Sequence, residues 1–121
     1  MRILVCDDEQ PTRRIIEVTL TPRGHEVISC ENASEAIACF EESLHSGRNF
    51  DWIVADVNLP GPSGFSLAGY VRAAGYKGNL AMFTGDAPEL GNMATVDAQY
   101  WPKPLAMQDL IYRVELPDKS Y

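Results

Sequence analysis

The chain has 121 residues, of which 45% are hydrophobic, and its formal net charge is −7 at pH 7. This length suits one globular domain with a core of its own, so we expect residues 1–121 to form a single domain. The acidic charge disfavours direct binding to nucleic acid or to anionic membranes, both of which attract basic surfaces. The apolar runs are too short to span a bilayer, so no membrane insertion is expected.

Cysteine usage and the N-terminal sequence favour a cytoplasmic protein. The three cysteines lack the spacing of a metal site, and their odd number suggests reduced thiols. Cys6 and Cys39 lie in apolar periodic segments, and we interpret them as small core residues. The charges of Asp7, Asp8 and Glu9 interrupt the apolar run near the N-terminus, which is therefore not expected to be a signal peptide.

The first half of the chain alternates apolar runs with helical patterns. Residues 3–6 and 25–29 predict two strands. The helix predicted between them, over residues 11–20, should bury Ile15, Ile16, Val18 and Leu20. A second helix is predicted to begin at a capping box, in which Asn32 caps the helix and Glu35 bonds back to it, and to end at Gly47. Its inner face should comprise Ala33, Ile37, Phe40 and Leu44.

The second half of the chain continues this alternation. Residues 51–55, 80–83 and 99–101 predict three more strands, and helices are predicted after Gly64 and over residues 107–114. The stretch GDAPELGNMATVDAQ, which precedes the last strand, has little helical signal because a glycine and an asparagine interrupt its periodicity. We therefore expect the fourth helix to be short or irregular.

The predicted elements form a βα unit that is repeated five times. Apolar strands separated by helices are typical of a parallel sheet covered by helices on both faces. The predicted fold class is therefore α/β, a doubly wound five-stranded parallel sheet. In such sheets ligand sites form beyond the carboxyl ends of the strands.

Polar side chains stand at four of the five strand ends. Asp7 and Asp8 follow the first strand, and Asp56 follows the third. Thr84 ends the fourth strand, and Lys103 follows the fifth. Each alone has an ordinary explanation as a cap, a turn residue, a structural hydroxyl or a surface lysine. Together they supply a carboxylate nucleophile, oxygen ligands for Mg²⁺, a hydroxyl and an ammonium, a set that suits phosphoryl transfer.

Four segments carry a resemblance to a known family, and together they are specific in order and spacing. They are ILVCDDE (3–9), WIVADVNLPGPSG (52–64), AMFTGD (81–86) and YWPKP (100–104). The chain resembles the receiver domain of two-component response regulators, and is similar to the stand-alone chemotaxis response regulators. The resemblance extends from residue 2 to about residue 116, and it implies the strand order 2-1-3-4-5.

The resemblance also implies a mechanism. Asp56 matches the phosphoacceptor, which takes a phosphoryl group from a histidine kinase or phosphotransfer protein. Mg²⁺ is implied as the cofactor, held by Asp7, Asp8, Asp56 and the backbone carbonyl of Asn58. A domain of this kind is a signalling phosphoacceptor rather than an enzyme with a substrate of its own.

Further positions match residues that contact the phosphoryl group or respond to it. Thr84 and Lys103 match the hydroxyl and the ammonium that contact it. Thr84 and Tyr100 match the switch pair that changes the partner-binding surface, so an output protein of unknown identity is implied. Pro104 matches a proline that follows a cis peptide bond.

Two other functions remain open from the residues themselves. One is a small Mg²⁺-dependent phosphatase with Asp56 as its nucleophile. Phosphatases of the haloacid dehalogenase type, however, carry their nucleophile after the first strand in a D-x-D motif, which Asp7-Asp8 does not form. The other is a docking domain that is never phosphorylated, and the complete set of site residues counts against this reading.

Overall fold

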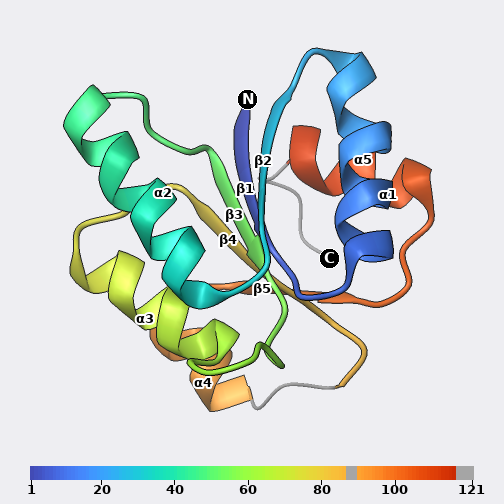
Figure 1. Ribbon diagram of the computed structural model, residues 1–121. Helices are drawn as coiled ribbons and strands as arrows, with labels where there is room; N and C mark the ends of the chain where they lie inside the picture. Colours follow the sequence, from blue (N-terminus) through green and yellow to red (C-terminus); the bar gives the residue numbers. More distant parts are fainter. Residues whose placement is uncertain (87–89, 117–121) are drawn as a thin grey trace.

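The computed structural model describes residues 1–86 and 90–116. Over these ranges five strands alternate with five α-helices (Figure 1). The strands are β1 (Arg2–Cys6), β2 (Glu26–Cys30), β3 (Trp52–Ala55), β4 (Asn79–Thr84) and β5 (Gln99–Pro102). The helices are α1 (Gln10–Leu20), α2 (Ala33–Ser46), α3 (Gly64–Ala73), α4 (Leu90–Val96) and α5 (Met107–Glu115), with a 3₁₀ turn at Thr21–Arg23.

The strands form one parallel sheet in the order β2-β1-β3-β4-β5, which confirms the predicted topology. In the register of this sheet, Cys6 at the end of β1 pairs with Cys30 of β2 and with Ala55 of β3. The residues that follow β1 and β3 therefore leave the sheet side by side. Since β5 is an edge strand, it tolerates Pro102, which has no N–H to donate.

Helices cover both faces of the sheet (Figure 1). Helices α1 and α5 lie on one face, where Ile16, Leu110 and Val114 pack on Trp52 and Trp101. Helices α2, α3 and α4 lie on the other face, over the alternate strand residues, such as Leu4, Ile53 and Met82. The indole N–H of Trp52 donates to the Val114 carbonyl at 3.0 Å, which ties the end of α5 to β3.

The predicted helix faces are correct only in part. Phe40, Ala33, Ile16 and Leu20 are buried, but Ile15, Val18 and Leu44 are about half exposed. A helix turns by about 100° per residue, so Ile15 and Val18 point away from the face that Ile16 and Leu20 share. Thr19 and Ser43 take the buried positions instead.

The capping box of α2 is also only half correct. The Asn32 side chain accepts the Glu35 N–H at 2.9 Å, as predicted. The Glu35 carboxylate, however, accepts the N–H of Glu31 at 2.7 Å, one residue before the cap. Gly47 ends the helix in the left-handed conformation that glycine adopts most easily, with φ of 72°.

Helix α4 has seven residues, which confirms the prediction of a short fourth helix. Part of that prediction concerns residues 87–89, which lie outside the described residues. The C-terminal end of α4 is held by Arg72 of α3. Its guanidinium donates to the carbonyls of Val96 and Asp97, at 2.8 and 2.9 Å, and to those of Tyr76 and Gly78 in the loop before β4, at 2.9 and 2.8 Å.

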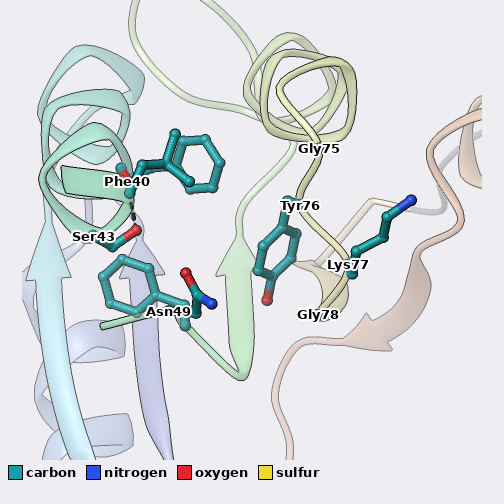
Figure 2. Close-up of a pocket in the computed structure, with 9 residues that line it drawn as sticks. Phe40, Ser43, Asn49, Gly75, Tyr76, Lys77 and Gly78 are labelled. Atoms are coloured by element: carbon teal, nitrogen blue, oxygen red, sulfur yellow. Dashed lines mark hydrogen bonds between the residues drawn. The ribbon is translucent and has the colours of Figure 1, made fainter. Parts of the chain in front are cut away.

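Aromatic side chains gather beyond the amino ends of β3 and β4. We call this region the amino edge, defined by Phe40, Phe50 and Tyr76. These residues line a cavity of about 140 Å³ between α2 and the loop before β4 (Figure 2). Tyr76 meets Phe40 edge-on at 6.0 Å between ring centroids, and its hydroxyl donates to the Asn79 carbonyl at 2.9 Å.

Candidate functional site

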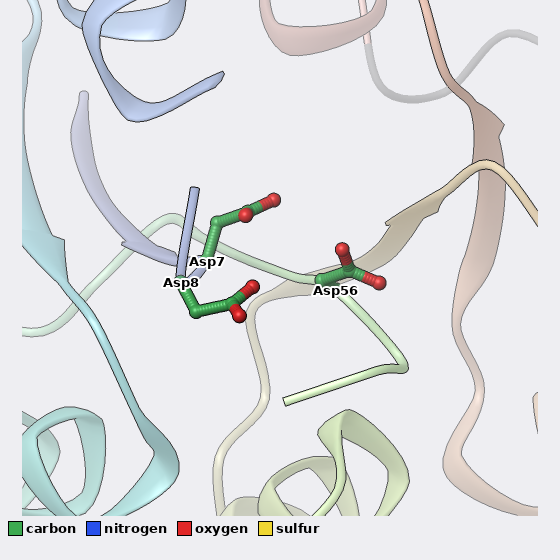
Figure 3. Close-up of side chains that lie close together, drawn as sticks. All are labelled: Asp7, Asp8 and Asp56. Atoms are coloured by element: carbon green, nitrogen blue, oxygen red, sulfur yellow. The ribbon is translucent and has the colours of Figure 1, made fainter. Parts of the chain in front are cut away.

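The carboxyl ends of β1 and β3 bring three carboxylates together. Asp7 and Asp8 extend from the end of β1 toward Asp56, which follows β3 (Figure 3). These three residues form the acidic cluster, in which one ligand oxygen from each lies within 4.8 Å of the others. Asp7 and Asp56 are buried, whereas Asp8 is exposed. The cluster therefore has one open side, on which a ligand has access to it.

Backbone hydrogen bonds between neighbouring strands hold the acidic cluster in place. The Asp56 N–H donates to the Cys6 carbonyl, and the Asp7 N–H donates to the Cys30 carbonyl, both at 3.0 Å. Each aspartate is thus fixed by the strand beside its own. The cluster depends on the sheet register rather than on a flexible loop.

Lys103 supplies a counter-charge to the acidic cluster. Its ammonium lies 2.7 Å from a carboxylate oxygen of Asp7 and 2.7 Å from one of Asp56. A carboxylate oxygen of Glu9 lies 3.2 Å from the same nitrogen. The backbone N–H of Lys103 donates to the Thr84 carbonyl. The peptide bond between Lys103 and Pro104 is cis, as the resemblance implied.

The protonation of these groups reflects burial and pairing together. Burial raises the pKa of Asp7, while the hydrogen bonds from Lys103 and from the Glu9 N–H oppose that rise. Burial lowers the pKa of Lys103, but the hydrogen bonds to Asp56 and Asp7 outweigh this effect, and the pKa lies above its ordinary value. Lys103 therefore stays positively charged beside the two buried carboxylates.

Thr84 and Asn58 lie at neighbouring strand ends and share Asp86 as a contact. Thr84 is buried, and its hydroxyl oxygen accepts the Asp86 N–H at 3.4 Å. The Asn58 side-chain amide donates to the Asp86 carboxylate at 2.6 Å, and the Asn58 N–H donates to Asp56 at 3.0 Å. These bonds link the loop after β3 to the loop after β4.

Tyr100 lies outside the acidic cluster. It pairs with Met82 across β4 and β5, and 37% of its surface is exposed. The structure thus places this predicted switch residue on the surface of the edge strand, three positions before Lys103.

Three residues with roles at the site were not singled out from the sequence. Glu9 contacts Lys103, and the Arg13 guanidinium donates to the Asp7 carbonyl at 2.6 Å. A β-carbon on Gly64 would lie 2.1 Å from the Asp56 carbonyl oxygen, so only glycine allows α3 to begin this close to β3. The acidic run Asp7-Asp8-Glu9 was a usable signal for Glu9, whereas Arg13 and Gly64 needed the three-dimensional arrangement.

The chain matches a known protein family over nearly its whole length. The family model described as the response regulator receiver domain matches residues 3–115. The chain belongs to the response regulator receiver domain family. As a receiver domain it is a phosphoacceptor signalling module of two-component systems, and the match gives no support to the phosphatase or docking alternatives.

Relatives and solved structures agree with this assignment. The transcriptional regulatory protein AruR of Pseudomonas aeruginosa is 29% identical in an alignment of 117 positions, which covers 94% of this chain and 48% of AruR. The chain thus spans about half the length of that curated relative. The chemotaxis protein CheY4 of Vibrio cholerae is similar in structure, with a TM-score of 0.84 and 26% identity over 94% of this chain and 95% of that one.

A second similar structure was solved with ligands. The response regulator TrrA of Thermotoga maritima, in complex with Mg²⁺-BeF, has a TM-score of 0.77 and 28% identity, and the similarity covers 94% of this chain and 96% of that one. In the present receiver domain the acidic cluster consists of carboxylate oxygens, which are the ligands that Mg²⁺ prefers. The donor set therefore fits a hard divalent cation.

No helix among residues 1–86 and 90–116 has the length and apolar character needed to cross a membrane.

Proposed function

We propose that this chain acts, over residues 1–121, as a single receiver domain in which Asp56 accepts a phosphoryl group from a histidine kinase or phosphotransfer protein of the same cytoplasm. The observation that carries the proposal is the position of the Asp56 carboxylate. It is buried, belongs to the acidic cluster, and lies 2.7 Å from the Lys103 ammonium. A carboxylate nucleophile, a fixed cation and an open side are the elements that phosphoryl transfer needs.

The transfer is an in-line displacement at phosphorus. A carboxylate oxygen of Asp56 forms the new P–O bond as the P–N bond of the donor phosphohistidine breaks, and the departing imidazole keeps the bonding electron pair and takes up a proton. Lys103 neutralises charge on the phosphoryl oxygens. The Asn58 N–H, which bonds the other oxygen of Asp56, holds the carboxylate in one orientation.

Asp7, Asp8 and Asp56 would hold Mg²⁺, with the backbone carbonyl of Asn58 as a further ligand. The cation would neutralise the charge that builds up among the carboxylate and phosphoryl oxygens. The exposed side of the cluster at Asp8 gives a hydrated cation access. Binding should thus depend strongly on Asp8, whose carboxylate is the one that faces solvent.

The output of the domain would follow from Thr84 and Tyr100. Thr84 ends β4 immediately before the segment that leads to α4, and Tyr100 lies on the neighbouring edge strand. Attraction of the Thr84 hydroxyl to a phosphoryl group on Asp56 would change the loop that Thr84 shares with Asp86. An output protein that contacts α4 and β5 would detect this change.

Covalent labelling tests the phosphoacceptor. The full chain is incubated with Mg²⁺ and acetyl phosphate, and its intact mass is measured. We expect one added phosphoryl group on the native protein and on Asp109→Asn, whose carboxylate is exposed on α5, but none on Asp56→Asn. Equal labelling of Asp56→Asn would disprove the assignment.

Titration calorimetry tests the cation site separately. Mg²⁺ should bind Asp8→Asn at least tenfold more weakly than the native chain, since the cluster loses its accessible charge. An unchanged affinity in this variant would remove Asp8 from the ligand set.

A further inference from the structure

Two cysteine thiols lie within van der Waals contact on the α2 side of the sheet. The sulfur of Cys30, at the end of β2, is 3.6 Å from the sulfur of Cys39, which lies in the middle of α2. Both are free thiols, and Cys30 is buried while Cys39 is partly exposed. We propose that Cys30 and Cys39 form a reversible disulfide on exposure to peroxide, and that this bond adjusts the position of Asp7 in the acidic cluster.

The exposure of the two thiols sets the order of the reaction. Cys6 and Cys30 are buried, whereas Cys39 is partly exposed. Peroxide in solvent therefore has little access to Cys6 and Cys30, and these two thiols are poor first nucleophiles. Cys39, which solvent reaches, is the thiol that meets the oxidant.

The chemistry then needs only the two thiols and hydrogen peroxide. The Cys39 sulfur attacks one peroxide oxygen, the O–O bond breaks, and sulfenic acid and water form. The Cys30 sulfur attacks the sulfenic sulfur, the S–O bond breaks, and the hydroxyl leaves as water with the proton of the Cys30 thiol. Two thiols are oxidised to one disulfide, and one peroxide is reduced to two waters.

A disulfide here would reach the acidic cluster through the backbone. The Cys30 carbonyl accepts the N–H of Asp7 at 3.0 Å. A disulfide is shorter than the present 3.6 Å contact between the sulfurs, so its formation would pull the Cys30 side chain toward α2. The Asp7 N–H is bonded to the residue that the disulfide would pull, so the Asp7 carboxylate would shift relative to Lys103.

Cys6 provides the matched control. It pairs with Cys30 in the sheet and is more deeply buried than Cys39. Among the described residues, the group of side chains close enough together to hold a metal ion is the acidic cluster, which contains no cysteine. Their proximity is therefore assigned to redox chemistry rather than to metal binding.

The test treats the folded full chain with hydrogen peroxide, alkylates the remaining thiols, and maps the peptides with and without reduction. Native chain and Cys6→Ser should lose two hydrogen atoms and give a Cys30–Cys39 linked peptide, which reductant reverses. Cys39→Ser should give neither. A link that includes Cys6, a link between two chains, or irreversible oxidation of Cys39 with no link would overturn the proposal.

The effect on Asp7 rests on the proposed phosphoacceptor function and has its own readout. The oxidised Cys6→Ser chain should be labelled by acetyl phosphate several-fold more slowly than the same chain after reduction. Equal rates would overturn the coupling while leaving the mapped disulfide intact. Failure of the reduced chain to be labelled at all would instead count against the phosphoacceptor assignment.

Discussion

At the carboxyl ends of the strands, the buried side chains are charged, whereas at the amino edge they are aromatic. The carboxylates of Asp7 and Asp56 share a single counter-charge, the Lys103 ammonium at 2.7 Å from each. Phe40 and Tyr76, beside the cavity at the amino edge, meet edge-on, and the one buried hydroxyl among these residues is hydrogen-bonded.

The two ends of the sheet differ in what their buried side chains contribute, which is folding free energy at the amino edge and phosphoryl transfer at the carboxyl ends. Burial of charge is costly, and a paired charge at best offsets that cost. Burial of aromatic surface contributes directly to the free energy of folding. We therefore expect substitutions at the amino edge to change stability without changing phosphoryl transfer, and substitutions at the carboxyl ends to change both.

The largest change in stability is expected for Phe40→Ala. Removing this fully buried ring should lower the free energy of unfolding by about 4 kcal/mol, since it enlarges a cavity that already exists. Leu44→Ala, one turn later on α2 and half exposed, is the control and should cost less than about 1 kcal/mol. Chemical denaturation measures both. A labelling rate of folded Phe40→Ala well below that of the native chain would contradict the separation of the two ends.

Lys103→Gln should have the next largest effect. Without divalent cation, its free energy of unfolding should fall by about 2 kcal/mol, because two buried carboxylates lose their counter-charge. Mg²⁺ should stabilise this variant more than the native chain, since the cation would replace the missing ammonium. Lys77→Gln, whose side chain is exposed and lies outside the amino edge as defined, should match the native protein in both conditions. Similar losses of unfolding free energy in the two variants would show that the ion pairs of Lys103 do not stabilise the fold.

A smaller effect is expected for Tyr76→Phe. The loss of the hydrogen bond to the Asn79 carbonyl should cost about 1 kcal/mol, because the ring remains packed and one buried acceptor loses its partner. In Tyr70→Phe, where the tyrosine is substantially exposed, water can replace the lost hydroxyl, and thermal unfolding should change little. A greater loss in Tyr70→Phe than in Tyr76→Phe would contradict the role given to the buried hydroxyl.

The smallest effect concerns pH. Arg23 and His25 contact Glu115 near the amino ends of the strands and lower its pKa to about 2. Since this pKa is lowered by folding, the stabilisation is complete above the ordinary pKa of 4.5 and is lost as the pH falls toward 2. The native chain should therefore lose more stability than Glu115→Gln between pH 6 and pH 3, as measured by denaturation at each pH. Equal losses would mean that the cluster contributes nothing.

Much of the fold and the acidic cluster could be predicted because each depends on order along the chain. Once the strands are parallel, residues that follow them must meet at one edge, which is why Asp7, Asp56 and Lys103 were found together. The burial of Ile15 was predicted wrongly, because four apolar residues at positions 15, 16, 18 and 20 span more of a helix than one face.

Contacts between distant side chains that do not follow from the order of the strands were the part that the sequence did not reveal. Glu9 and Lys103 are 94 positions apart, and the pairing of Cys30 with Cys39 depends on how α2 lies on β2. Neither follows from periodicity, since side-chain direction across two elements is set by packing. The cap at Asn32 is local, and it was predicted correctly. The Glu35 carboxylate accepts the N–H of Glu31 instead of the expected N–H of Asn32.

The Arg72 guanidinium has a mechanical consequence for α4. It is a rigid planar fork, and it joins the last residue of α4 and the residue after it to the loop before β4 through four carbonyl groups. Any displacement of α4 that keeps these bonds must be a rotation about its C-terminal end, so the helix pivots at its contact with Arg72. A displacement of α4 would then be largest where the helix begins and smallest at Asp97.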